Sequence, residues 1–397
     1  MRNKWGIVLA TAGIHASIGN VYAFSVLTKP IMETCGFTLT QTTLAFSGAI
    51  LFLGISACLL SKYVDEYGPT KMGIVATICF TLGLFGSALA ISMQSLSLLY
   101  LFYSVILGTG LGIGYTTPVS TLIKYFPNRP GMASGTAIMS FALGSVIASP
   151  VMQTLITSYN LITNFLILGF AYMIVMLFSS LYLAPPEDCK AETKEESIVC
   201  LKPKEVYHTW QFKVLFLIFY INVTAGISLL ATISPMTQEL FNFTPERAAG
   251  FVMIIAVLNC LGRFAWASFS DIITRKWTYI LFFVIEAICF FLLAGTTNEY
   301  LFELLVLIII SCYGGGFSCL PPYLADLFTK QYLSTIHGRT LLAWGLAGTT
   351  AILAPLTREL TGSYHTILWL YGCWFIIALG MAWKLKGGST IDDIRRS

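Results

Sequence analysis

The chain has 397 residues, of which 56% are hydrophobic and only 11% charged, and its formal net charge is +4. A soluble domain carries roughly 25% charged residues, so this composition, with a mean hydropathy of +0.77, excludes a water-soluble protein and predicts a fold surrounded by lipid. The sequence has no basic aromatic patch that would predict a nucleic-acid partner.

Runs of about 20 apolar residues are long enough to cross a bilayer as α-helices. The sequence contains twelve such runs, and charged residues or clusters of proline, glycine and asparagine separate nearly all of them. The first run is too long for a cleaved signal peptide, so we expect a retained membrane helix. The predicted spans are 5–28, 41–61, 72–93, 96–123, 132–157, 162–184, 212–236, 246–269, 277–296, 301–326, 338–357 and 364–383.

Residues 186–211 differ from the rest of the chain because they are charged and weakly apolar. We expect them to form a cytosolic linker, with room for a short surface helix, between an N-terminal six-helix bundle (1–185) and a C-terminal one (212–397). The predicted fold class is therefore an all-α polytopic membrane protein, with twelve transmembrane helices in two pseudo-symmetric six-helix bundles.

Lysine and arginine concentrate in the cytoplasmic loops of membrane proteins. With both termini in the cytosol, 19 of the 23 basic residues fall on the cytosolic side. Lys29, Arg247 and Arg358 fall outside, and Arg263 is left within a span. The distribution predicts cytosolic termini, and we expect the plasma (inner) membrane as the location and a monomer as the working unit.

The two halves of the sequence resemble each other weakly. SKYVDEYGPTK (61–71) follows the second span and ASFSDIITRKW (267–277) follows the eighth, so that Asp65 and Asp271 occupy matching places. GLGIGYTTP (110–118) and YGGGFSCLPP (313–322) match in the fourth and tenth spans. Parallel duplication of this kind is typical of transporters built from two six-helix halves.

The loop 61–71 resembles the signature between helices 2 and 3 of the major facilitator superfamily, with Asp65, Gly68 and Lys71 retained. Further strings resemble the oxalate/formate antiporter family and the related monocarboxylate transporters, in both halves and over most of the chain. The resemblance implies a major facilitator fold, alternating-access transport and a carboxylate substrate. The strings are GNVYAFSVL (19–27), KYFPNRPGMASG (124–135), CLGRFAWASFSD (260–271), LPPYLADLF (320–328), AWGLAG (343–348) and TGSY (361–364).

Arg263 is the strongest candidate for substrate binding. It lies eight residues before Asp271, so it is roughly 12 Å above the cytosolic helix end and near the bilayer midplane. A charge at that depth costs at least roughly 2.5–3.5 kcal/mol and is normally kept for a substrate or ion path. The planar guanidinium matches a carboxylate, and the resemblance implies the same role; a structural ion pair is the alternative.

Trp344 marks a departure from the family pattern. Relatives that carry a dicarboxylate have a lysine near this position, whereas here no lysine or arginine follows Arg339 in the run. One intramembrane cation matches one carboxylate better than two, because a second negative charge would stay desolvated and unpaired. We therefore expect a monocarboxylate such as formate, lactate or pyruvate, carried with a coupling proton or in exchange for a counter-anion.

Three further residues are candidates for the binding cavity. His15 lies in the middle of the first span, with Tyr22 seven residues later on the same face. Histidine titrates near neutrality, so His15 is a candidate both for substrate binding and for proton coupling. Tyr22 and Tyr115 resemble cavity-lining aromatic residues of the family. For each of the three, a packing role within the bundle is the alternative.

Glu286 is a second candidate for proton coupling, because it lies about 15 Å into the ninth span. A structural hydrogen bond is the alternative there. The resemblance assigns the loop residues to gating, which holds neighbouring helix ends together in one access state; capping and solvation are the alternatives. The gating set is Asp65, Gly68, Lys71, Asp271 and Arg275.

Two other classes of function compete with transport of a carboxylate. A major facilitator protein for another organic solute, such as an amino acid or drug, is one alternative, and a non-transporting carboxylate sensor that signals through 186–211 is another. The sequence contains no HExxH, GxSxG or paired intramembrane aspartates, so we expect no enzymatic activity. The ten cysteines form no CxxC pair, and we expect no metal site and no cofactor.

Overall fold

The computed structural model describes residues 2–186, 201–350 and 353–385, and these residues form helices and short connections without any strand. The elements are α1 (Lys4–Ile18), η1 (Gly19–Ala23), α2 (Phe24–Cys35), α3 (Leu39–Leu60), α4 (Lys62–Tyr67), α5 (Pro69–Ser92), α6 (Leu96–Leu99), η2 (Tyr100–Leu107), α7 (Gly108–Tyr125), α8 (Pro130–Ser158), α9 (Leu161–Tyr182), α11 (Pro203–His208), α12 (Trp210–Phe241), α13 (Pro245–Ile273), α14 (Arg275–Gly295), α15 (Glu299–Leu327), α16 (Leu333–Thr350), α17 (Leu353–Thr361) and α18 (His365–Lys384).

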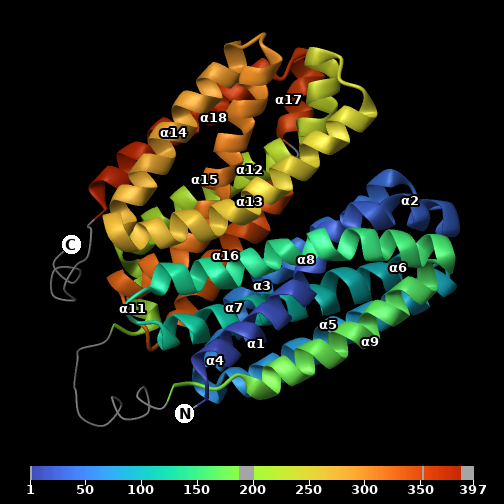
Figure 1. Cartoon of the computed structure of the whole chain (residues 1–397), viewed down its shortest axis with the longest axis vertical. Coiled ribbons are helices and arrows are strands. Elements are labelled where there is room, and N and C mark those ends of the chain that lie inside the picture. The colour runs from blue at the N-terminus through green and yellow to red at the C-terminus, as the bar shows by residue number, and fades with distance from the viewer. Residues whose placement is uncertain (1, 187–200, 351–352, 386–397) are drawn as a thin grey trace.

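The helices form two bundles, which confirms the predicted fold class. Figure 1 shows α1 to α9, coloured blue to green, in one bundle and α12 to α18, coloured yellow-green to red, in the other. The ribbons of the two bundles meet near the end of the molecule where both chain termini lie, and they diverge toward α2 and α17. We call these two ends the termini face and the opposite face.

The predicted spans correspond to the helices that are long and apolar enough to cross a membrane. Eleven helices in the described part of the chain meet that criterion. The remaining predicted span, 338–357, falls on α16 and α17, on either side of residues 351–352. α16 packs between α3 and α12 and therefore belongs to the bundle even though its sequence is less apolar.

Two predicted boundaries are wrong. The first helical segment continues from Lys4 to Cys35 rather than ending near residue 28. Lys29 pairs with Glu33 one turn later at 3.7 Å, which supports the helix at its exposed end. The seventh span begins at Trp210, inside the predicted linker, and α11 is the short helix for which that linker has room. Residues 187–200 of the linker lie outside the described residues.

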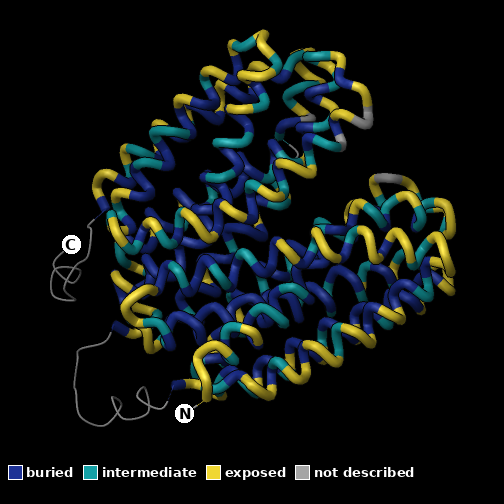
Figure 2. Tube along the Cα trace, viewed as in Figure 1, coloured by how far each residue is buried: buried dark blue, intermediate teal, exposed yellow. Residues whose placement is uncertain are grey.

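The outer surface of the bundles is apolar, as lipid requires. Helix α9 exposes Leu166, Phe170, Ile174 and Phe178, which recur at every fourth position along one side. Figure 2 shows buried residues concentrated inside and between the bundles and exposed ones along their outer sides. The side chains that face away from the core therefore form a surface suited to acyl chains.

The two halves touch mainly through two helix pairs, α8 with α13 and α3 with α16. Their backbones approach closely near the termini face. A Cβ added at Gly131 would lie 2.1 Å from the carbonyl oxygen of Ala267, and one added at Gly338 would lie 2.2 Å from that of Ala57. Only glycine permits these approaches, so the closed contact at the termini face depends on both residues.

The loops at the termini face contain a pair of matching backbone conformations. Gly68, between α4 and α5, has φ +86° and ψ 163°, a region open essentially only to glycine. Thr274, between α13 and α14, occupies the corresponding place in the second half with φ +74° and ψ 155°. A β-branched residue in this region is strained by about 1–3 kcal/mol.

We therefore expect Thr274→Gly to raise the melting temperature of the detergent-purified protein, because glycine adopts this conformation without strain. Gly68→Thr is the matched opposite change and should lower it. Scanning fluorimetry of the two variants beside the unmodified protein measures both effects. A melting temperature for Thr274→Gly below that of the unmodified protein would contradict the strain.

The positive-inside distribution predicts that the termini face is cytosolic. In a cysteine-free variant, Lys204→Cys in α11 should resist a membrane-impermeant maleimide in intact cells and react after permeabilisation. Glu359→Cys in α17, at the opposite face, should react in intact cells; both native side chains are exposed. Labelling at residue 204 in intact cells would reverse the orientation.

Candidate functional site

Arg263 lies in the middle of α13, about 15 Å along the helix axis from its end at Ile273. Its side chain is completely buried at the contact between the halves. Nε donates to Asn259 Oδ1 one turn earlier at 3.3 Å, and Nη1 donates across the interface to the carbonyl oxygen of Ile138 in α8, also at 3.3 Å. The arginine therefore contacts both halves.

The guanidinium has no negatively charged partner in the part of the chain that the structure describes. Within the described residues, no carboxylate lies within ion-pair distance of Arg263. The centre of the Phe317 ring lies 5.3 Å from its central carbon, close enough for a cation–π contact, and Nη2 has no hydrogen-bond partner. A structural ion pair, the alternative reading of this arginine, is therefore absent from the described residues.

Three aromatic side chains bring further unpaired polar atoms to the same place. Tyr22 comes from η1, Tyr115 from α7 and Trp344 from α16, and Tyr22 Oη, Tyr115 Oη and Trp344 Nε1 are buried without a hydrogen bond of good geometry. Tyr22 Oη lies close enough to Arg263, Trp344 and Tyr313 to interact weakly with each of them. The Trp344 ring lies 6.2 Å from that of Tyr22 and 5.3 Å from that of Tyr115. Both tyrosines interact electrostatically with Arg263. We call these four residues the Arg263 site.

The Arg263 site is rich in donors. The guanidinium and indole nitrogens can only donate, and each phenol has one O–H to donate. An unpaired buried donor costs about 1–3 kcal/mol, and each such group in a native protein calls for an explanation. A bound anion with several acceptor lone pairs would satisfy these donors together, and a carboxylate has that chemistry.

His15 lies behind Tyr115, with the two rings stacked at 5.2 Å. Its ring nitrogens face the carbonyl oxygens of Ala137 and Tyr115, the latter at 3.1 Å. A neutral imidazole donates from only one nitrogen, so both contacts are hydrogen bonds only when the ring is protonated. His15 therefore presents no free polar atom to the Arg263 site in this conformation, and its role in proton coupling stays a prediction.

Glu286 lies apart from these residues, inside the second half. Asn222 in α12 donates from Nδ2 to both carboxylate oxygens of Glu286 in α14, at 3.0 and 3.2 Å. This is the structural hydrogen bond that was the alternative to proton coupling for Glu286. Asn222 Oδ1 has no partner, and a Cβ at Gly316 would lie 2.4 Å from it.

Asp271 binds the beginning of a helix in the other half. Its two carboxylate oxygens accept hydrogen bonds from the backbone N–H groups of Gly131 and Met132, each at 2.9 Å, in the first turn of α8. Arg275 pairs with Asp271 and, at 3.2 Å, with Asp326. A carboxylate at a helix N-terminus is stabilised by the helix dipole and the free amides, so Asp271 holds the halves together at the termini face.

Asp65 forms the matching contact from the first half. It accepts hydrogen bonds from the backbone N–H and the hydroxyl of Thr335 in the first turn of α16, at 2.8 and 2.7 Å, and Lys124 Nζ lies 3.7 Å away. Burial raises the pKa of the Asp65 carboxyl above its ordinary value, while Lys124 and Thr335 act to lower it. Gly68 shapes the adjoining loop. Lys71 is exposed, and its predicted part in gating rests on the resemblance alone.

Sequence reasoning missed several of these partners. Lys124 and Thr335 complete the Asp65 contact, and Phe317 covers Arg263, but each is distant in sequence from the residue it meets, so no spacing connects them. Sequence spacing could have found Asn259, because its place four residues before Arg263 puts both on one helix face.

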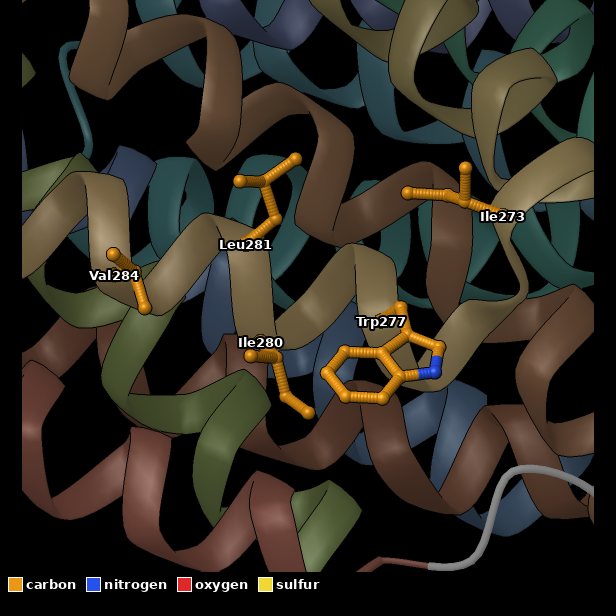
Figure 3. A pocket seen from close by; sticks show the side chains of 5 residues that line it. All are labelled: Ile273, Trp277, Ile280, Leu281 and Val284. Carbon is orange, nitrogen blue, oxygen red and sulfur yellow. The ribbon is translucent and has the colours of Figure 1, made fainter.

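A surface pocket on the second half is unrelated to these residues. It has a volume of about 490 Å³ and is lined by the apolar side chains of Ile273, Trp277, Ile280, Leu281 and Val284, as Figure 3 shows. Four of the five come from α14. Apart from the indole N–H of Trp277 the lining offers no polar group to orient a polar solute, and its place on the outer side of the second half suits contact with lipid.

Comparison with known proteins assigns the family. The model of the Major Facilitator Superfamily matches residues 9–352. The chain is 24% identical to the uncharacterized MFS-type transporter YhjX of Escherichia coli (strain K12), over 87% of this chain and 86% of that protein. It is 24% identical to the oxalate:formate antiporter of Oxalobacter formigenes, over 88% of this chain and 83% of that protein.

The fold is similar to that of solved transporters of the same kind. The proton:xylose symporter XylE, bound to 6-bromo-6-deoxy-D-glucose, superposes with a TM-score of 0.77 at 13% identity, over 98% of this chain and 97% of that one. At that identity the likeness concerns the fold alone. With the family model covering most of the sequence, the chain belongs to the Major Facilitator Superfamily, and it is a multi-pass membrane transporter of that superfamily.

Proposed function

We propose that this protein carries a small monocarboxylate, such as formate, lactate or pyruvate, across the membrane by alternating access. The observation that carries the proposal is the group of buried donors around Arg263 that lack a well-formed hydrogen bond, with no described carboxylate paired to the guanidinium. The oxalate:formate antiporter of Oxalobacter formigenes is a relative whose substrates are small carboxylates by name.

The position of the Arg263 site suits alternating access. Tyr22 and Tyr115 belong to the first half, while Arg263 and Trp344 belong to the second. When the halves rock, the distance between the two sets of donors changes, so the bound anion contacts both halves only in some states. Substrate binding and reorientation are coupled through these contacts.

The charge of the site favours one carboxylate. Among the described residues Arg263 is the only arginine or lysine of the site. By the family resemblance, Trp344 lies near the position where dicarboxylate carriers have a lysine. A monoanion leaves the occupied site neutral. A dianion would leave one negative charge desolvated, which costs several kcal/mol.

Flux into liposomes tests the proposal. Purified protein reconstituted with internal lactate should take up labelled lactate, pyruvate or formate saturably, and empty liposomes should not. An amino acid or a cationic drug serves as the comparison solute. Uptake of the comparison solute but not of the acids would overturn the proposed substrate class, and binding of the acids without flux would identify a sensor.

Trp344→Lys should shift the preference of the carrier toward dicarboxylates. The unmodified protein should bind oxalate at least ~10-fold more weakly than lactate, and the added ammonium should reverse that order, since it pairs with the second carboxylate. Trp344→Phe, which adds no charge, is the control and should keep the preference for lactate. Isothermal titration measures both ligands; tight oxalate binding by the unmodified protein would contradict the idea.

A further inference from the structure

His337 is a buried polar residue that does not belong to the Arg263 site. It lies in α16 with 1% of its surface exposed, and its Nδ1 has no hydrogen-bond partner. His337 and Trp344 are seven residues apart, so they lie on one face of α16, about 10 Å apart. The Tyr115 ring contacts both, at 5.3 Å from Trp344 and 6.0 Å from His337.

His337 lies in the part of α16 that packs against the first half near the termini face. Ser334, one turn earlier, donates to Ser120 of α7 at 2.6 Å. Gly338, the next residue, lies against the backbone of α3 at Ala57. His337 therefore lies between the Arg263 site and the termini face, within the layer of side chains that must separate when that face opens.

A buried imidazole nitrogen without a hydrogen bond costs free energy in the closed state. The hydroxyl of Tyr115, whose ring contacts that of His337, has no hydrogen bond either. Two buried polar groups on contacting rings that are left unsatisfied in one conformation call for a function in another. Among the described residues no carboxylate pairs with them. Asp65 is held by Thr335 and Lys124, and the titratable group near both rings is His15, which stacks on Tyr115 and interacts electrostatically with His337.

We propose that Tyr115 Oη and His337 Nδ1 form a second carboxylate-binding position, which the substrate occupies between the Arg263 site and the termini face once that face opens. This inference rests on the proposed function. The phenol O–H and the imidazole N–H, in the tautomer protonated on Nδ1, donate to the carboxylate. Both donors are uncharged, so the anion is held more weakly than by Arg263 and can leave toward the termini face.

The second carboxylate-binding position predicts that a substitution at His337 changes KM for lactate from one face of the membrane and not from the other. His337→Phe removes the nitrogen and keeps a ring, so KM for lactate entering from the termini face should rise about tenfold, while KM from the opposite face should stay unchanged. His337→Asn, whose amide nitrogen can replace Nδ1, should restore KM to within about threefold. Tyr115→Phe should raise KM from both faces, because its hydroxyl serves both positions.

Right-side-out and inside-out membrane vesicles provide the measurement, with the orientation fixed by protease digestion of a C-terminal tag. His365→Phe, at the opposite face, is the matched control and should change neither KM. If His337→Phe does not fold, His337→Leu replaces it. Equal KM values for the variant and the unmodified protein, or an equal rise from both faces, would overturn the second position. Lack of any carboxylate flux in the unmodified protein would instead overturn the proposed function.

Discussion

Arg263→Ala is expected to abolish nearly all carboxylate transport and to weaken carboxylate binding at least ~30-fold. Removing one partner of a buried, hydrogen-bonded charge pair typically costs about 2–5 kcal/mol of binding free energy. Here the substrate carboxylate is that partner, since no described acidic side chain pairs with Arg263. The loss should therefore appear in binding as well as in flux.

Arg263→Lys should fold and insert but recover only a small part of the transport. The ammonium supplies the charge without the planar fork that bonds a carboxylate twice. It also lacks the nitrogens that contact Asn259 and Ile138. Lactate uptake into proteoliposomes, at equal protein density, compares the unmodified protein with Arg263→Ala and Arg263→Lys.

Arg263→Met separates binding from stability. Replacing a buried uncompensated charge by an apolar side chain of similar volume is often neutral or stabilising. This variant should therefore melt at or above the temperature of the unmodified protein while losing carboxylate transport. A strongly lowered melting temperature, restored by a second substitution at an acidic residue, would show that Arg263 is part of an ion pair.

Removal of both gate aspartates is expected to open the termini face. Asp65→Ala with Asp271→Ala deletes four hydrogen bonds between the halves, each with a carboxylate acceptor. Such bonds contribute about 1.5–3 kcal/mol each, and a tenfold shift between the two states needs only about 1.4 kcal/mol. The closed population should fall at least tenfold, and exchange flux should fall with it because the carrier no longer closes.

A buried cysteine reports this opening. Ser120 is 1% exposed and is bonded to Ser334 across the interface, so Ser120→Cys in a cysteine-free protein should react slowly with N-ethylmaleimide. The rate should rise more than tenfold in the double aspartate variant. Glu66→Ala, at an exposed residue beside Asp65, is the matched control and should change nothing. An unchanged rate in the double variant would mean that the aspartates only cap helices.

The sequence predicted the helices well, because apolar length is a local property. The prediction failed at helix ends that hydropathy does not determine. Lys29 and Pro30 indicate an end, yet the helix continues to Cys35 and stops at Gly36, whose φ of +72° ends it. The Lys29–Glu33 pair that supports this turn is exposed, and an exposed charged residue does not end a helix.

Those residues of the candidate site that stand out individually in the sequence could be predicted. Arg263 is an isolated charge in an apolar helix. The strings around Tyr22 and Trp344 resemble a known family, and Tyr115 resembles one of its cavity-lining residues. The structure brings these four residues together. The contacts between the halves were not predictable, since Asp271 bonds backbone amides of α8 and Asp65 bonds Thr335. An amide has no sequence signature, and His337 lacked any pattern that sets it apart.

Equilibrium binding of lactate to detergent-purified protein tests the central claim most directly. Titration calorimetry on the unmodified protein should give saturable binding of one lactate per chain, and the folded Arg263→Met variant should show none at the same concentrations. Equal affinity in the two proteins would remove Arg263 from the substrate site, and with it the case for an anionic substrate.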